Sequence, residues 1–466
     1  MSKRRIFMIS ALVTACLPML AEVPLPVEFH GYFRAGSGTS SAGGEMAAFW
    51  LPGAVTKYRF GNEAENYGEL EADAVVWDKD GARFKVHAMA QFWNPYSAGQ
   101  NAQSVGTASA NRDFDMSQYW IEGQGLLGDS AAFRDAGLWV GKRYYNRHHI
   151  EIVDFYTWTN QGIGGGIEDI DLGFGKLHYA YIQTDNTNNL NTGPAMEAVT
   201  GQNVVGTHAL RLSDLKTNPG GALSIGLEFA RARPYRSVSL DSSAPAANPA
   251  TGSGVANANN GVSIYLEHVQ SGVMGGDNTF SVGCGTGASS PLNQLGWGSG
   301  TSPDPSLTSA NRTLRVVDAL TLELAPPFAM QAVGSYQNSR DAAGARTVWT
   351  SLGARPMWFV TRHFSVVLEA GLDRVKYPDD YAPTGAPSAA AGDTGRLLKS
   401  TLGVVWRPEA RFASVPQLRA FVTNADWNQV ANQAGLNAAG AQTIANGTFA
   451  GKTSGTNYGI QGEVWW

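Results

Sequence analysis

The sequence predicts an all-β fold, a transmembrane antiparallel β-barrel, on two observations. First, the chain ends in strict alternation: Tyr458, Ile460 and Val464 share an apolar face, and Gln461 and Glu463 share the opposite, polar face. A period of two indicates a strand, and apolar-out with polar-in is typical of a membrane-spanning barrel. Second, no run after residue 21 approaches the ~20 apolar residues of a membrane helix, so residence in a membrane requires a barrel.

The N-terminus has the features of a secretory signal sequence. Residues 3–5 are basic, and a short apolar core follows up to Ala21. We therefore expect residues 1–21 to be a signal peptide and residues 22–466 to form one barrel domain. Residues 13–16 resemble a lipoprotein cleavage box, but an ordinary signal sequence is the stronger interpretation.

Alternation also predicts strands from the first mature residues onward. Tyr32 and Arg34 fall on the lumen-facing side of one strand, and Lys57 and Arg59 fall on that side of a strand near residues 57–60. On the next predicted strand, Tyr67 and Glu69 face inward together with the other acidic residues of that face. Further strands are predicted at 84–92, 177–182, 209–215, 223–230, 262–269, 314–324, 348–354, 364–372 and 398–406.

Connections of two kinds separate these strands. Residues 78–81 form a short turn, whereas 185–205, 240–261 and 284–312 are long and polar. Short turns on one rim and long loops on the other are typical of outer-membrane barrels. At about 25 residues for each strand and its turn, the length indicates roughly 16 to 18 strands, enough to keep an aqueous channel.

Residues 141–158 are too rich in ionisable side chains for a lipid-facing strand, so this segment should fold over the lumen or form its wall. Within it, His148, His149 and Glu151 match no zinc-binding spacing, and we expect no metal. No nucleophile–base arrangement stands out, so we expect neither an enzyme nor a cofactor. The formal charge of −5 makes nucleic acid an unsuitable partner.

Three inward aromatic residues, Tyr32, Tyr67 and Trp465, give the first indication of a solute. The C–H face of a sugar ring packs on an aromatic ring, and its hydroxyl edge bonds to arginine and carboxylate groups. The alternative is that these residues belong to the aromatic belt at the membrane interface. Their position on the polar side of each strand favours the lumen.

At these residues the chain resembles the maltoporin family of sugar-specific outer-membrane porins. Residues 27–36, 57–63, 67–70, 141–156, 218–221, 354–357 and 463–466 carry the resemblance. It implies an 18-stranded barrel with an inward-folded constriction loop and a homotrimer in the outer membrane of a Gram-negative bacterium. It also implies passive uptake of maltose and linear maltodextrins.

The resemblance implies roles for single residues as well. Tyr32, Tyr67 and Trp465 match an aromatic slide that binds the sugar. The polar track and constriction are matched by Arg34, Arg59, Glu69, Arg147, Asp154 and Tyr156. His149 replaces a carboxylate of the best-known members, which would make the local charge depend on pH.

Two further slide aromatics are missing from the resemblance. Asp277 and Ala413 stand at their positions, with Phe280 and Phe412 nearby as candidate substitutes. A general porin, or one selective for sucrose, other sugars or small polar solutes, is therefore an alternative to a maltodextrin channel. A barrel enzyme or a surface adhesin is the more distant alternative.

Overall fold

The structure is a computed structural model, and it describes most of the chain outside the N-terminus and several long connections. The described residues are 27–43, 46–63, 65–95, 115–185, 204–232, 259–296, 303–324, 327–382, 388–435, 448–449 and 451–466. The expected signal peptide lies outside them. No helix among these residues is long and apolar enough to cross a membrane.

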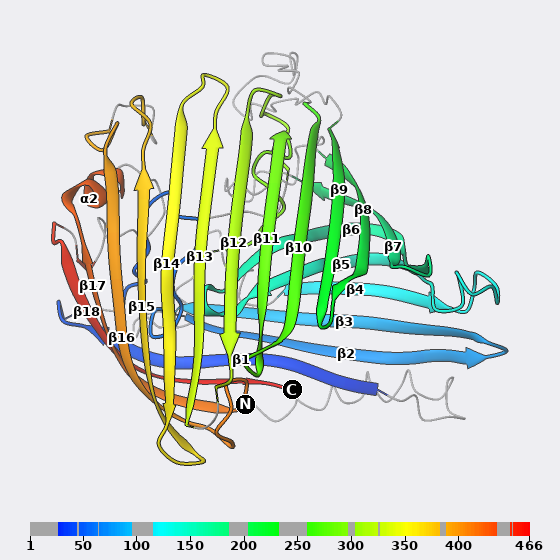
Figure 1. The fold of residues 1–466 in the computed structure, drawn as a ribbon, viewed down its shortest axis with the longest axis horizontal. Helices are drawn as coiled ribbons and strands as arrows, with labels where there is room; N and C mark the ends of the chain where they lie inside the picture. The colour runs from blue at the N-terminus through cyan, green and yellow to red at the C-terminus, as the bar shows by residue number, and fades with distance from the viewer. Residues whose placement is uncertain are drawn as a thin grey trace, which may run out of the picture.

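The described residues form one antiparallel sheet of 18 strands that closes on itself. Strand β1 (Val27–Ser40) pairs with β2 (Glu65–Lys79) along one edge and with β18 (Ser454–Trp465) along the other, as the blue and red ribbons of Figure 1 show. The predicted all-β barrel is confirmed. The intervening strands are β3 (Ala82–Pro95), β4 (Asp115–Gln124), β5 (Gly137–Ile150), β6 (Phe155–Asp171), β7 (Lys176–Asp185), β8 (Val204–Asn218), β9 (Gly221–Ala232), β10 (Gly261–Val273), β11 (Gly276–Gly287), β12 (Arg312–Leu322), β13 (Phe328–Arg340), β14 (Arg346–Phe359), β15 (Phe364–Lys376), β16 (Thr394–Trp406) and β17 (Gln417–Trp427).

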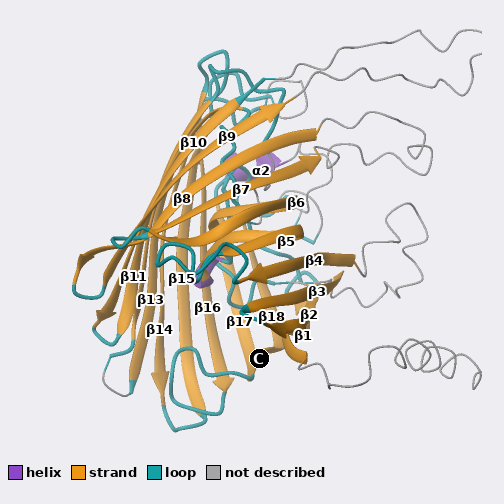
Figure 2. Cartoon of the chain, turned by 90° about the vertical axis from the view of Figure 1, so that its right-hand side faces the viewer, coloured by secondary structure: helices purple, strands orange, loops and turns teal. Residues whose placement is uncertain are grey.

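The two rims of the barrel differ in the length of their connections. Two-residue turns at 80–81, 219–220 and 274–275 lie on one rim, and Figure 2 shows several short connections of this rim in teal at its lower left. Most connections of the opposite rim are long, and the one after β17 contains the helix α2 (Gln429–Gly435). This asymmetry is the outer-membrane pattern that the loop lengths predict.

Side chains alternate across the wall as predicted. On β18, Tyr458 and Ile460 are exposed on the outer face, and Gln461 and Glu463 are buried on the inner face. Four strands, β4, β11, β13 and β17, were not predicted, and β5 and β6 were predicted only as a segment, residues 141–158, that folds over the lumen or forms its wall. In β11 the alternation is hidden because the inner positions include Gly283 and Gly285, whose missing side chains leave room for a neighbouring connection.

The strand predicted at residues 57–60 is wrong. These residues belong to the connection between β1 and β2, which folds into the barrel. The ring of Tyr58 packs on Gly371 of β15, where no side chain intervenes, and its hydroxyl lies 2.9 Å from Ser351 Oγ. Phe60 packs on Gly403 of β16 in the same way. Arg59 therefore enters the lumen from a connection that is supported by the opposite wall.

Residues 141–158 both form the wall and fold over the lumen. They contribute to strands β5 and β6, and the short 3₁₀ helix η2 (Glu151–Val153) forms the hairpin tip. Arg355 of β14 holds Glu151 with its Nη1 atom at 2.8 and 3.0 Å from the two carboxylate oxygens. The backbone N–H of Arg59 donates to Ile152 O at 3.2 Å. The tip thus connects the inserted β1–β2 connection to the opposite wall.

We predict that Gly371→Val releases the β1–β2 connection from the wall. A Cβ there would overlap the Tyr58 ring, and such overpacking costs about 1–3 kcal/mol. Single-channel conductance in planar bilayers should rise because the lumen widens. Gly334→Val on β13 is the matched control, since its Cβ would meet no atom closer than 3.9 Å. Equal conductance of the two variants would contradict this account of the lumen.

Candidate functional site

The lumen contains a cavity of about 620 Å³ where the hairpin tip and the inserted β1–β2 connection face the strands β18, β1 and β2. Every residue that the sequence assigned to the slide, the polar track or the constriction lines this cavity. These residues are Tyr32, Arg34, Arg59, Tyr67, Glu69, Arg147, His149, Asp154, Tyr156 and Trp465. Their juxtaposition depends on barrel closure, because Tyr32 and Trp465 come from opposite ends of the chain.

Three aromatic residues on adjacent strands form a band along one wall of the cavity, which we call the aromatic band: Trp465, Tyr32 and Tyr67. Tyr32 pairs directly with Trp465 across β1 and β18. On β2, the residue paired with Tyr32 is Glu69. Tyr67 is the next inward-facing residue along β2, two positions before Glu69. The ring centroids of Tyr32 and Tyr67 are 5.8 Å apart. The band therefore runs diagonally across three strands.

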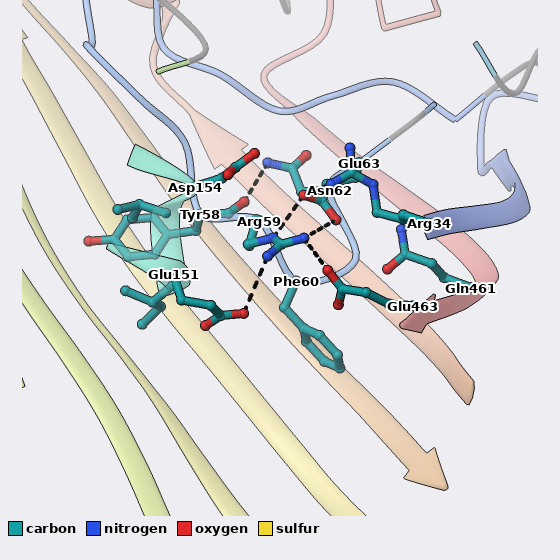
Figure 3. Close-up of polar contacts among 12 residues, drawn as sticks. Arg34, Tyr58, Arg59, Phe60, Asn62, Glu63, Glu151, Asp154, Gln461 and Glu463 are labelled. Carbon is teal, nitrogen blue, oxygen red and sulfur yellow. Dashed lines mark hydrogen bonds and ion pairs between the residues drawn. The ribbon is translucent and has the colours of Figure 1, made fainter. Parts of the chain in front are cut away.

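Buried ion pairs next to the aromatic band hold it in position. Figure 3 shows Arg59 between Glu463 and Glu63 on one side and Glu151 on the other. Its Nη2 lies 2.5 Å from Glu463, and its Nε lies 2.8 Å from Glu63. Arg34 also binds Glu63 at 2.8 Å. The hydroxyl of Tyr32 donates to Glu463 at 2.6 Å, so this ring is held in place by the charge network.

The opposite wall presents stacked polar side chains. The Arg147 guanidinium lies 4.2 Å from the Tyr144 ring centroid and 4.3 Å from that of Tyr156. The His149 ring stacks on Tyr156 at 4.5 Å, and its Nε2 lies 3.2 Å from an oxygen of Asp154. His149 and Asp154 are the most exposed of these, at 34% and 42% of the side chain, so they are available to a solute.

Two carboxylates at the hairpin tip remain charged. Burial raises the pKa of Glu151, but the charges of Arg355 and Arg59 outweigh burial and hold this pKa below its ordinary value. Partial burial likewise raises the pKa of Asp154, although the carboxylate is open to the lumen. The hydrogen bond from His149 and the charge of Arg59 outweigh that effect and lower the pKa of Asp154.

Several lining residues were not singled out from the sequence. Tyr144 and Gln91 join the cavity wall, and the Tyr144 hydroxyl donates to Gln91 at 3.0 Å. Tyr144 lies within the polar segment 141–158, where its place in the alternation was obscured by charged neighbours. Nothing in the sequence distinguishes Gln91 as a cavity residue, because a single glutamine in a strand indicates only which face of the strand is polar.

The other candidates from the sequence do not join this cavity. His148 binds Glu267 and lies 2.8 Å from Asn146, so it does not converge with His149 and Glu151. Phe280 is 42% exposed and pairs with the outward residues of its neighbours, which makes it unsuitable as a slide residue. Phe412 lines a second cavity of about 310 Å³ beyond the hairpin tip, together with Asp277.

Solved structures of other outer-membrane proteins are distantly similar to this chain. OmpT of Vibrio cholerae in its trimer form is 9% identical, with 95% of this chain and 100% of that chain covered and a TM-score of 0.38. OpdK of Pseudomonas aeruginosa is 8% identical, with 95% and 99% covered and a TM-score of 0.47. A second structure of OpdK of Pseudomonas aeruginosa, with vanillate, is 8% identical, with 94% of this chain and 98% of that chain covered and a TM-score of 0.46. Similarity at this level carries no argument about the solute.

The family comparison is far more specific. The family model of the LamB porins matches residues 27–466, from the first described strand to the last residue. The match includes the aromatic band, the hairpin tip and the inserted connection between β1 and β2. The chain therefore belongs to the LamB porin family of outer-membrane channels, which catalyse no reaction.

Proposed function

We propose that this outer-membrane channel is selective for carbohydrates and lets maltose- or maltodextrin-like oligosaccharides diffuse passively along the aromatic band. The observation that carries the proposal is the band itself, three aromatic side chains in line on one wall and hydrogen-bonding side chains on the other. A sugar needs both, because its ring faces are apolar and its edges carry hydroxyl groups.

The charges around the cavity support a neutral solute. Four cationic side chains line it, and four anionic ones balance them: Arg34, Lys57, Arg59 and Arg147 against Glu65, Glu69, Glu151 and Asp154. Balanced charges give an ion little net attraction, whereas the more exposed of these groups, such as Asp154 and Arg147, still offer charge-assisted hydrogen bonds to a hydroxyl group. Contacts that are numerous and individually weak let a solute enter and also leave.

A less selective channel is the alternative. The short extent of the aromatic band favours it. Asp277 and Ala413 line the second cavity, where further aromatic residues would extend the sugar path. A channel with so few stacking positions would also pass sucrose or other small polar solutes. The resemblance to maltoporins further leads us to propose a homotrimer, which chemical cross-linking in native outer membranes would test.

The direct test is block of ion current by sugar in planar bilayers. We expect maltotriose at millimolar concentration to reduce the current, because a sugar on the aromatic band occupies the ion path. Sucrose should block less than maltotriose if the channel prefers linear maltodextrins. Equal block by both sugars would favour the broader alternative, and a current that neither sugar alters would contradict carbohydrate selectivity.

We predict that Trp465→Ala weakens maltotriose block. Loss of one stacking contact should cost about 0.5–1.5 kcal/mol, which is roughly a twofold to tenfold higher half-blocking concentration. Trp466→Ala is the matched control, because the neighbouring side chain does not line the cavity. Trp465→Phe should retain part of the block, since a smaller ring remains. If both alanine variants behave like the parent protein, Trp465 does not contact the sugar.

We also predict that Tyr156→Ala raises single-channel conductance. Removal of the ring takes away the surface on which His149 and Arg147 stack, so the lumen becomes wider at the hairpin tip. Tyr179→Ala, which removes a tyrosine exposed on another strand, is the control and should leave conductance unchanged. Conductance that stays at the parent value in Tyr156→Ala would show that the narrowest point lies elsewhere.

A further inference from the structure

A second group of lumen-facing side chains lies between the aromatic band and the rim of short turns, on strands β1 to β3. His30 pairs with Glu71 across β1 and β2, and Asp73 pairs with His87 across β2 and β3. Potential ligand atoms of Glu71, Asp73 and His87 all lie within 4.8 Å of one another. Those of Glu28, His30 and Asp73 do so as well, and Asp73 belongs to both groups.

Negative charge in this group exceeds what the nearby lysine neutralises. Lys85 Nζ lies 2.9 Å from Asp73 Oδ2 and 3.1 Å from Glu28. Glu71 forms no hydrogen bond or ion pair with any other residue that the structure describes, although it is two positions from Asp73 on the same face of β2. Two carboxylates on the same face of one strand repel each other, and a cation bound between them would relieve that repulsion.

The position of His87 within this group is a second observation. His87 is 6% exposed, and its ring stacks on that of Trp120 with the two ring centroids 3.6 Å apart. Its Nδ1 lies 2.8 Å from Asp73 Oδ1. Its Nε2 is buried and has no hydrogen-bond partner among the described residues, and the nearest oxygen of Glu122 is 3.6 Å away. A histidine that binds a metal through one nitrogen commonly directs the other N–H at a carboxylate. Glu122 lies where this second carboxylate belongs.

We propose that Glu71, Asp73 and His87 bind a divalent transition-metal ion, Zn²⁺, and that His30 completes the site. Two imidazoles with two carboxylates suit tetrahedral zinc, whereas calcium and magnesium prefer oxygen ligands alone. No spacing pattern in the sequence indicates this site, because its ligands come from three strands. The ion would reduce the negative charge of the lumen near the rim of short turns, without contacting the aromatic band.

The test is a calorimetric titration of untagged, chelator-treated full-length protein in detergent with ZnCl₂. We expect about one ion per chain, and we expect Asp73→Asn and Glu71→Gln each to weaken binding about tenfold or more. His268→Asn on β10 is the matched control, because it removes a histidine that bonds to Thr217 far from the cluster. Glu71 is only half-buried, so Glu71→Gln tests the site without disturbing a packed residue.

A second measurement separates a lumen site from incidental surface binding. ZnCl₂ should shift the ion selectivity of the parent channel toward anions in planar bilayers and leave that of Glu71→Gln unchanged. Three results would overturn the proposal: no zinc binding by the parent protein, equal zinc binding by the parent and both cluster variants, or calcium binding as tight as zinc binding. Maltotriose block should be the same in the parent and Glu71→Gln, since the cluster is separate from the aromatic band.

Discussion

The pairing of the first strand with the last is the constraint on which the rest of the structure depends. An open sheet edge would leave backbone groups without partners in lipid, so the sheet must close. Closure in the observed register places Tyr32 opposite Trp465 and Arg34 opposite Glu463. Because side chains alternate with a period of two, a slip of one residue would turn all of these groups toward lipid. The aromatic band exists only because of this register.

Buried charge then determines how the lumen is filled. Arg59 in the inserted connection binds Glu463 of the last strand, and Glu151 in the hairpin tip binds Arg355 of the opposite wall. Such pairs are costly to desolvate and costly to break, so they contribute geometry more than stability. Glycine on β14, β15 and β16 gives the inserted aromatic rings their space. The ion pairs and the inserted rings together make the passage narrow. Most of its charged groups are already paired before a solute enters.

Alternation is a local property, and it predicted much of the fold and of the cavity wall. Tyr32, Tyr67 and Trp465 were placed on the inner face because each shares its face with charged neighbours. The connection at 57–60 was misread as a strand because its alternating charges copy a strand pattern, while its support comes from Gly371, over 300 residues away. Parity alone would have excluded Phe280, which is three positions from the inward Asp277. Neither the hairpin tip contacts nor the zinc ligands could be predicted, since both require strand register.

The central claim is that a sugar moves along the aromatic band inside the barrel. The most direct measurement is an experimental structure of the channel with bound maltotriose. We expect its glucose rings to lie against Trp465, Tyr32 and Tyr67, within about 4.5 Å of the aromatic carbons, with hydroxyl groups directed at His149 and Asp154. Maltotriose bound only in the second cavity beside Phe412, with no ring against the aromatic band, would contradict the account.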